Sequence, residues 1–431
     1  MFDSSLVDTL WGTFQGSLSV LITTLAGYLA ARYEFLDRPT VKRVSNISSL
    51  LFLPCLIVVQ MGPYLTAQEL GTVWIMPVWG LLSSVIAHLL GWLGKATLRL
   101  EWWTVVASGR ANANALPLLL LQSLENSGVL STLRKPGESM TETLDRAKSI
   151  VLLNSVIQQV ITFSLGSSLL RRDLQNAKIE NCDPEGDRLN PGSRAARFPA
   201  IQDTEHVGLL RDYDHDESED DDFRIPFNQL DNTPDLDVWS RLPVSPRVRR
   251  VFYKSRKLVK KGFSWLNPPV AGACVALFLG MIPALHHAFL SKDGFFYDSL
   301  TQAVKNLGGL FVSLQMFILG ADLALVPSTK PKIRGTISVL SIRYLLMPLI
   351  SMAFVYFTAG KGWYTDDPLV WFLLILVPSG PSAMVLINLA ELMNIDQGPI
   401  AGFLALSYLL SPFISVVCTM ALKVVEVVEE R

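Results

Sequence analysis

The sequence predicts an all-α integral membrane protein whose two halves each contribute five transmembrane helices. Half of the 431 residues are hydrophobic and only 17% are charged, whereas a soluble chain usually carries about 25% charged residues. Ten stretches are long enough to cross a bilayer, which takes about 20 mostly apolar residues. The fourth and the ninth stretches are both interrupted by proline and small polar residues, so the two halves share one unusual feature.

The ten apolar stretches fall into two groups of five, separated by a polar insert. They comprise residues 11–31, 44–61, 72–94, 103–121 and 147–170, then residues 268–290, 299–325, 336–358, 368–393 and 399–424. An odd number of spans per half gives the halves opposite orientations if they share a fold. The expected domains are a first five-helix repeat at 1–170, the insert at 171–264 and a second five-helix repeat at 265–431.

Residues 108–117 interrupt the fourth stretch and form the strongest candidate for a binding site. Pro117 removes a backbone donor, and hydrocarbon cannot satisfy the groups that such a break sets free. Asn112 and Asn114 carry uncharged amides that we expect to face the protein interior. Free N–H groups and helix-end dipoles near the break can bind an anion. The alternative is a proline kink whose asparagines bond a neighbouring helix.

A Pro-Ser-Gly-Pro sequence at 378–381 interrupts the ninth stretch. Broken helices at corresponding places in two halves are the best sequence indication of a transporter's binding site. The second break therefore favours a functional role for the first. The candidate substrate-binding residues are Arg110, Asn112, Asn114, Pro117, Pro378, Ser379, Gly380 and Pro381.

Several polar residues inside the spans have two readings. Arg110 either attracts an anionic substrate to the first break or extends its side chain back to the cytosolic surface. For Arg343, in the eighth stretch, extension to the surface is the favoured reading. Gln158 and Gln159 in the fifth stretch either line the same cavity or form hydrogen bonds between helices.

The insert is expected on the cytosolic side, because Lys and Arg gather there and in the loops after the first, third and seventh spans. The loop 122–146 is an exception, since it carries Arg134, Lys135 and Arg146 on the other side. The insert holds roughly half of the chain's charges, and its composition predicts disorder. Its basic end, 247–261, is either an amphipathic helix on an anionic leaflet or a flank of the next span.

Other classes of function lack their signals. A net charge of −1 suggests no nucleic-acid partner. The four cysteines have no CxxC spacing and the five histidines form no ligand set, so neither a metal nor another cofactor is expected. The chain contains no GxSxG, HExxH or Walker sequence, which argues against an enzyme and against transport driven by nucleotide hydrolysis.

The motifs together resemble the auxin efflux carrier family, in particular its PIN-LIKES and related fungal branch. The resemblance covers nearly all of the chain outside the insert. It rests on residues 51–57 in the second stretch, 112–117 followed by 122–124 in the fourth, 267–269 before the sixth, 319–323 at the end of the seventh, and 367–369 and 378–383 in the ninth. Asn112 and Pro117 match the crossover asparagine and proline of the family.

The resemblance implies a fold similar to bile-acid transporters and sodium/proton antiporters, with two inverted five-helix repeats and crossing fourth and ninth helices. Helices one, two, six and seven would form a scaffold that makes a homodimer. The family carries organic anions such as indole-3-acetate, although Arg110 departs from the small or polar residue expected at its position. The PIN-LIKES branch favours the endoplasmic reticulum membrane, with the plasma membrane and the vacuole as alternatives.

Two hypotheses of different classes follow from these patterns. The leading one is a secondary transporter or uniporter of small organic anions, auxin-like carboxylates, that works by alternating access. The alternative is a non-transporting membrane receptor that signals through the cytosolic insert. Saturable flux of a labelled acid would distinguish the first from the second.

Overall fold

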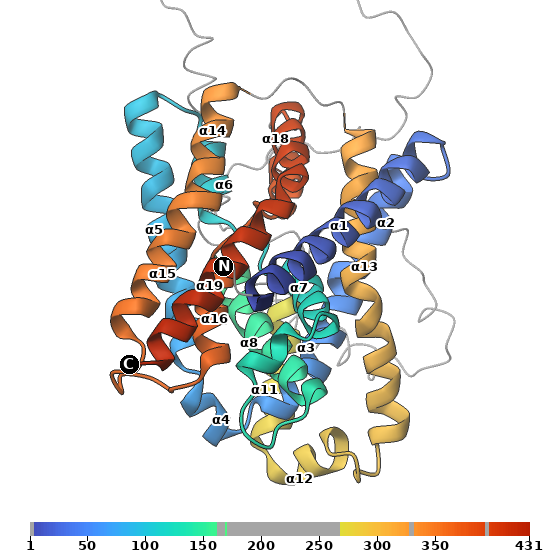
Figure 1. The fold of residues 1–431 in the computed structure, drawn as a ribbon. Coiled ribbons are helices and arrows are strands. Elements are labelled where there is room, and N and C mark those ends of the chain that lie inside the picture. Colours follow the sequence, from blue (N-terminus) through green and yellow to red (C-terminus); the bar gives the residue numbers. More distant parts are fainter. Residues whose placement is uncertain (1–3, 162–168, 170–267, 327–331, 393–395) are drawn as a thin grey trace, which may run out of the picture. The chain divides into compact units, whose positions relative to one another are not determined.

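The computed structural model describes residues 4–161, 169, 268–326, 332–392 and 396–431 (Figure 1). This part of the chain is helical and contains no strand, only one isolated bridge between two residues. Six of its helical segments are long and apolar enough to cross a membrane, and a seventh is added if one bent pair counts as a single span. The described residues therefore form a multi-pass membrane protein, as the composition predicts.

The helices of the first half end close to the predicted boundaries. They are α1 (Ser4–Arg32), α2 (Arg38–Ile47), α3 (Leu53–Met61), α4 (Ala67–Thr72), α5 (Ile75–Leu98), α6 (Trp102–Gly109), α7 (Ala115–Asn126) and α8 (Met140–Ile161). A π-helical turn, Ser48–Phe52, joins α2 to α3 into one span. Pro54 lies just after it and cannot donate a backbone hydrogen bond, which accounts for the widened turn.

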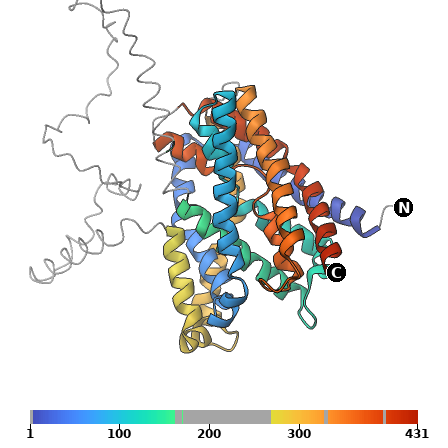
Figure 2. The same cartoon turned by 90° about the vertical axis from the view of Figure 1, so that its left-hand side faces the viewer.

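The second half has sharper interruptions than the first. Its helices are α11 (Pro268–Met281), α12 (Pro283–Leu285), α13 (Gln302–Leu325), α14 (Ile333–Ser341), α15 (Met347–Thr358), α16 (Pro368–Leu376), α17 (Val385–Leu392), α18 (Gly398–Leu409) and α19 (Ile414–Glu429). The chain bends by 95° between α11 and the helical segment Pro283–Leu290, where Pro283 ends the helical ladder. Figure 2 shows α14 and α15 running beside α5.

The tenth predicted span, 399–424, does not form one helix. Instead α18 is a separate short helix, and the span-length helix runs over Ser411–Glu429. Pro412 lies at the junction, in a 3-10 turn, and lacks the N–H that would continue α18. The predicted boundary of this span is therefore wrong, because the residues on both sides of Pro412 are apolar and hydropathy alone does not detect where the proline ends the helix.

A group of helices packs through glycine, and we name α1, α3, α11 and α13 the glycine-packed group. A Cβ atom on Gly27 of α1 would lie 1.8 Å from the carbonyl oxygen of Phe317 in α13. A Cβ atom on Gly320 would lie 1.8 Å from the carbonyl oxygen of Thr24. Only glycine permits this backbone approach, which is typical of helix packing in membranes.

Candidate functional site

The two breaks meet in space. Ala111 and Ser382 form an antiparallel bridge, in which the N–H of Asn112 donates to the carbonyl of Pro381 at 2.9 Å and that of Ala383 donates to the carbonyl of Arg110 at 3.1 Å. We name residues 110–114 and 377–384 the crossover. The segments flanking it, α6 and α7 on one side and α16 and α17 on the other, belong to the fourth and ninth apolar stretches of the sequence.

The first break arises from backbone that leaves the helical region after Gly109. Arg110 is extended (φ −115°, ψ 101°), and Asn114 precedes α7 with φ −114° and ψ −89°. Pro117 lies in the first turn of α7, where a backbone N–H has no partner within its helix in any case. The proline therefore starts the second half-helix instead of kinking a continuous one.

The second break depends on Gly380, whose φ is +94°. An L residue rarely adopts this conformation, and a Cβ atom there would lie 2.6 Å from Cδ1 of Ile414. Pro378 and Pro381 cannot donate backbone hydrogen bonds. Ser379 instead donates its hydroxyl to the carbonyl of Ile375 at 2.7 Å. This bond satisfies a carbonyl at the end of α16.

Side chains of neighbouring helices satisfy the carbonyl groups that the breaks set free. Ser382 donates its hydroxyl to the carbonyl of Ala107 at 2.8 Å. Ser84 of α5 donates to Gly109 at 3.3 Å, and the indole of Trp79 donates to Leu374 at 2.8 Å. Since an unpaired buried carbonyl is costly, these donors stabilise the irregular backbone.

Asn112 forms a hydrogen bond to a neighbouring helix, as the alternative reading of the first break expects, through a residue that the sequence analysis did not name. Its Nδ2 donates to the hydroxyl of Tyr408 on α18 at 2.7 Å, and both side chains are buried. Its Oδ1 accepts from the N–H of Asn114 at 3.3 Å, while the Oδ1 of Asn114 is buried without a hydrogen-bond partner. Tyr408 lies near the end of α18, four residues before Pro412, and that proline is the one nearby sequence signal.

Two arginines are buried at the crossover. Arg110 is 5% exposed, and its Nε and Nη1 have no hydrogen-bond partner. Arg343, in the π-helical turn Ile342–Leu346, is 1% exposed. Its Nε donates to the carbonyl of Gly380 at 3.0 Å, and its Nη2 has no partner. The prediction that Arg343 extends to the surface is therefore wrong, since the crossover carbonyl holds it inside the protein.

The glutamines of α8 favour the structural reading. Gln158 donates its Nε2 to the carbonyl of Gly80 on α5 at 3.1 Å, which is a hydrogen bond between helices. Asn154, on the same helix, approaches so closely that its Oδ1 lies 2.1 Å from where a Cβ atom on Gly80 would be. These contacts join α8 to α5, and Gln159 is buried as well.

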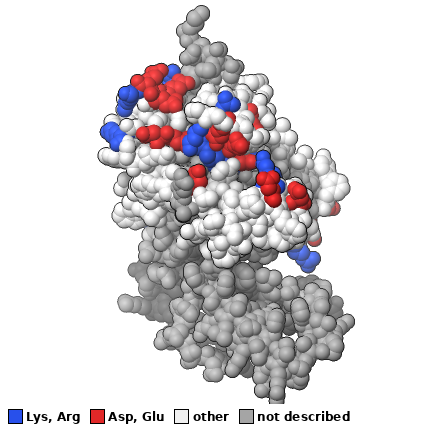
Figure 3. Space-filling model, turned by 90° about the horizontal axis from the view of Figure 1, so that it is seen from below, with Lys and Arg blue, Asp and Glu red and all other residues white. Residues whose placement is uncertain are grey.

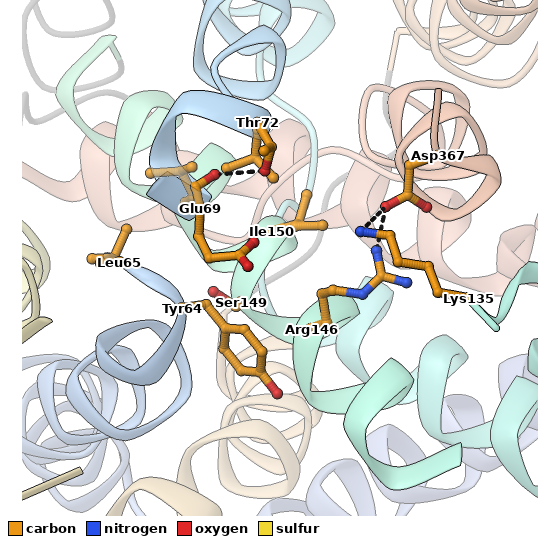
Figure 4. A pocket seen from close by; sticks show the side chains of 11 residues that line it. Tyr64, Leu65, Glu69, Thr72, Lys135, Arg146, Ser149, Ile150 and Asp367 are labelled. Carbon is orange, nitrogen blue, oxygen red and sulfur yellow. Dashed lines mark hydrogen bonds and ion pairs between the residues drawn. The ribbon is translucent and has the colours of Figure 1, made fainter. Parts of the chain in front are cut away.

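A cluster of ion pairs lies at the start of α8 and α16, and Figure 4 shows three of its residues, Lys135, Arg146 and Asp367, beside a pocket. Arg146 donates two hydrogen bonds to Glu138, at 2.8 and 2.9 Å, and a third to Asp367. Lys135 also pairs with Asp367, at 3.1 Å. Asp367 caps α16 by accepting from the N–H of Leu369 at 3.0 Å. We name Lys135, Glu138, Arg146 and Asp367 the ion-pair cluster.

Lys135 and Arg146 are two of the three basic residues in the loop 122–146 that were exceptions to the expected cytosolic position of Lys and Arg, and both belong to the ion-pair cluster. Lys135 and Arg146 are neutralised locally by carboxylates. Burial acts to raise the pKa of Glu138, but the hydrogen bonds and the charge of Arg146 outweigh it and hold that pKa below its usual value. Figure 3, which views the end of the molecule that carries α4 and α12, shows acidic and basic side chains beside one another.

Sequence comparison identifies the family. The family described as "Membrane transport protein" matches residues 14–419. An uncharacterized transporter of Schizosaccharomyces pombe is 24% identical over 419 residues, covering 91% of this chain and 90% of the relative. The protein PIN-LIKES 2 of Arabidopsis thaliana is 25% identical over 422 residues, covering 90% and 89%.

A third relative points the same way. An uncharacterized transporter of Saccharomyces cerevisiae is 24% identical over 409 residues, covering 92% of this chain and 91% of the relative. The family and the two fungal relatives are named for transport. Among the residues that the structure describes, no group of three or more His, Cys, Asp or Glu side chains is arranged to hold a metal ion. The chain belongs to the membrane transport protein family of the auxin efflux carriers and is an integral, multi-pass membrane protein.

Proposed function

We propose that this protein is a secondary transporter or uniporter of small organic anions, and that the substrate binds at the crossover. The observation that carries the proposal is the buried meeting of two broken spans beside two arginines with unsatisfied N–H groups. Irregular backbone at membrane depth persists only where protein or a wet cavity surrounds it. Polar and charged groups at that depth most often mark a substrate pathway.

The substrate's carboxylate would replace bonds that the crossover now makes to itself. Asn112 would release Tyr408 and donate its amide to the carboxylate, with Asn114 beside it. The first-turn N–H groups of α7 add a partial positive charge. Arg110 contributes a full positive charge in surroundings of low dielectric, where electrostatic attraction far exceeds its strength in water.

Alternating access would require the crossover to move past a stable partner. The glycine-packed group fits the role of the scaffold, because its backbones approach too closely for the helices to slide. Helices α5 to α8 and α14 to α19 would then move together, exposing the crossover to either side. The scaffold is also the surface through which we propose that the protein forms a homodimer.

The proposed location follows the relatives named PIN-LIKES. We favour the endoplasmic reticulum membrane over the plasma membrane and the vacuole. The insert, 171–264, would face the cytosol, since it carries many of the basic residues that remain on that side. The whole insert lies outside the described residues.

Uptake of labelled organic acids into proteoliposomes tests the proposal. We expect saturable flux that Asn112→Ala weakens and that Asn306→Ala leaves unchanged. Asn306 is an exposed asparagine on α13 and serves as the matched control. Specific binding without flux would instead favour a membrane receptor, and the absence of both would remove organic anions as substrates.

A further inference from the structure

Two fixed positive charges lie at the crossover, one on its first segment and one on the π-helical turn Ile342–Leu346, which contacts its second segment. Arg110 belongs to the first segment, and its carbonyl accepts from Ala383 of the second. Arg343 is bonded through Nε to Gly380 of the second segment. His88 of α5 packs against the first segment, since a Cβ on Gly109 would lie 2.1–2.3 Å from its ring atoms. Both guanidiniums are close enough to His88 for their charges to act on it.

These charges lack the compensation that this chain provides elsewhere. Arg146 is saturated by the carboxylates of Glu138 and Asp367. The ion pairs between described residues include neither Arg110 nor Arg343. Guanidinium stays protonated in proteins, and an uncompensated buried charge is strongly unfavourable. No carboxylate among the described side chains supplies the counter-charge for the two crossover arginines, and an anionic ligand would supply it.

We propose that the crossover selects a small dianion over a monoanion, with one negative charge at Arg110 and the second at Arg343. This inference rests on the proposed function, because it assigns the charge of the substrate at the same site. Two arginines supplied by different segments fit two separated carboxylates, as in a dicarboxylate. A single doubly charged head group, as in inorganic phosphate, shares the same chemistry, and the experiment distinguishes the two.

The test measures binding and uptake by the full-length protein in proteoliposomes. The probes are succinate, its monomethyl ester, indole-3-acetate and inorganic phosphate. We expect succinate to bind about ten- to hundredfold more tightly than its monomethyl ester, the range for one added charged hydrogen bond. Preference for phosphate over succinate would assign one compact anion site instead of two carboxylate sites.

Variants identify the residue that binds the second negative charge of the ligand. Arg343→Gln is expected to abolish the preference for succinate while its monomethyl ester still binds, and Arg343→Lys is expected to retain part of the preference. Arg334→Gln removes the same charge from an exposed position on the preceding helix, α14, and is expected to change nothing. Glu391→Gln removes the single acidic residue of α17, and it is also expected to leave the preference intact.

The outcomes separate this inference from the proposed function. Saturable uptake of monoanions with no preference for succinate would contradict the inference of a dianionic substrate. It would still support the proposed transport function. No uptake of any probe contradicts the proposed function itself. A preference that Glu391→Gln abolishes assigns the second charge to a residue of the chain and overturns the inference. The wild-type ratio of succinate to its monomethyl ester decides the matter even if Arg343→Gln fails to fold.

Discussion

Buried arginine occurs in two regions of this molecule with opposite charge balance. In the ion-pair cluster, Arg146 meets two carboxylates that use its donors and neutralise its charge. At the crossover, Arg110 and Arg343 retain N–H groups with no partner. A compensated charge holds two elements of structure together, whereas an uncompensated one destabilises the empty protein and gains a partner only when a ligand binds. The same residue type is therefore structural in one region and suited to binding in the other.

The comparison predicts the largest loss of stability from Arg146→Ala. Removing this guanidinium leaves the buried carboxylate of Asp367 and the partly buried carboxylate of Glu138 with fewer partners, and breaking a buried ion pair typically costs about 3–5 kcal/mol. Thermal or chemical unfolding of the detergent-solubilised protein measures the change. Lys148→Ala, which breaks an ion pair with the partly exposed Asp145 on the same helix, is the control and is expected to cost at most about 1 kcal/mol. A loss no larger than that of the control would show that the cluster adds little.

At the crossover, Arg110→Gln is expected to act on binding and not on stability. The empty protein should unfold at the same temperature or a higher one, because an uncompensated buried charge has been removed. Affinity for a carboxylate should fall by about 1.5–3 kcal/mol, the range for a hydrogen bond to a charged group. The amide analogue of that carboxylate should lose far less. Equal losses for both ligands would return Arg110 to a structural role.

A smaller effect is expected from the pair Asn112 and Tyr408. Asn112→Ala should lower substrate affinity by about 0.5–1.5 kcal/mol, and by more if it donates to a charged group, without unfolding the protein. Tyr408→Phe removes the hydroxyl that occupies the amide of Asn112 in the empty state. A double-mutant cycle measures their coupling. Unchanged affinity and flux in a correctly inserted Asn112→Ala protein would remove Asn112 from the site.

The ion-pair cluster also predicts a dependence of stability on pH. The pKa of Glu138 is held below its usual value, so its contribution is fully present above the pKa of a glutamate in the unfolded chain. That contribution is lost as the pH falls from there through the lower pKa of the folded protein. Unfolding measured over this window should show wild type and Glu138→Gln converging in stability. Parallel curves would mean that Glu138 is not the titrating group.

The smallest effect is expected outside both regions. Deleting residues 180–240 of the insert should leave uptake within a few fold in proteoliposomes, since both the crossover and the ion-pair cluster lie outside it. A regulatory role is proposed for the same segment, because Ser218 lies in an acidic run and phosphate would add about −1.5 to −2 charge. Complete loss of uptake in a normally folded deletion variant would contradict this prediction.

Local sequence was sufficient for most of the helices and for the location of the two breaks that meet at the crossover. Apolar length predicts a span because backbone hydrogen bonds within a helix are made between near neighbours. Proline and glycine act at their own positions, so Pro117, Pro378 and Gly380 indicated where the spans are interrupted. The same reasoning missed the proline break at Pro412, which lies inside an otherwise continuous apolar run.

Only the tertiary structure decided which groups meet. The pairing of Ala111 with Ser382, the bond from Asn112 to Tyr408 and the burial of Arg343 against Gly380 join residues far apart in the chain. Hydropathy reports how apolar a segment is and not which of its faces contacts a neighbour, so it predicted a surface position for Arg343. The sequence by itself determined the membrane class, most of the spans and the two breaks. The charge balance that separates the crossover from the ion-pair cluster was set by packing, because it depends on which carboxylates lie within reach of each guanidinium.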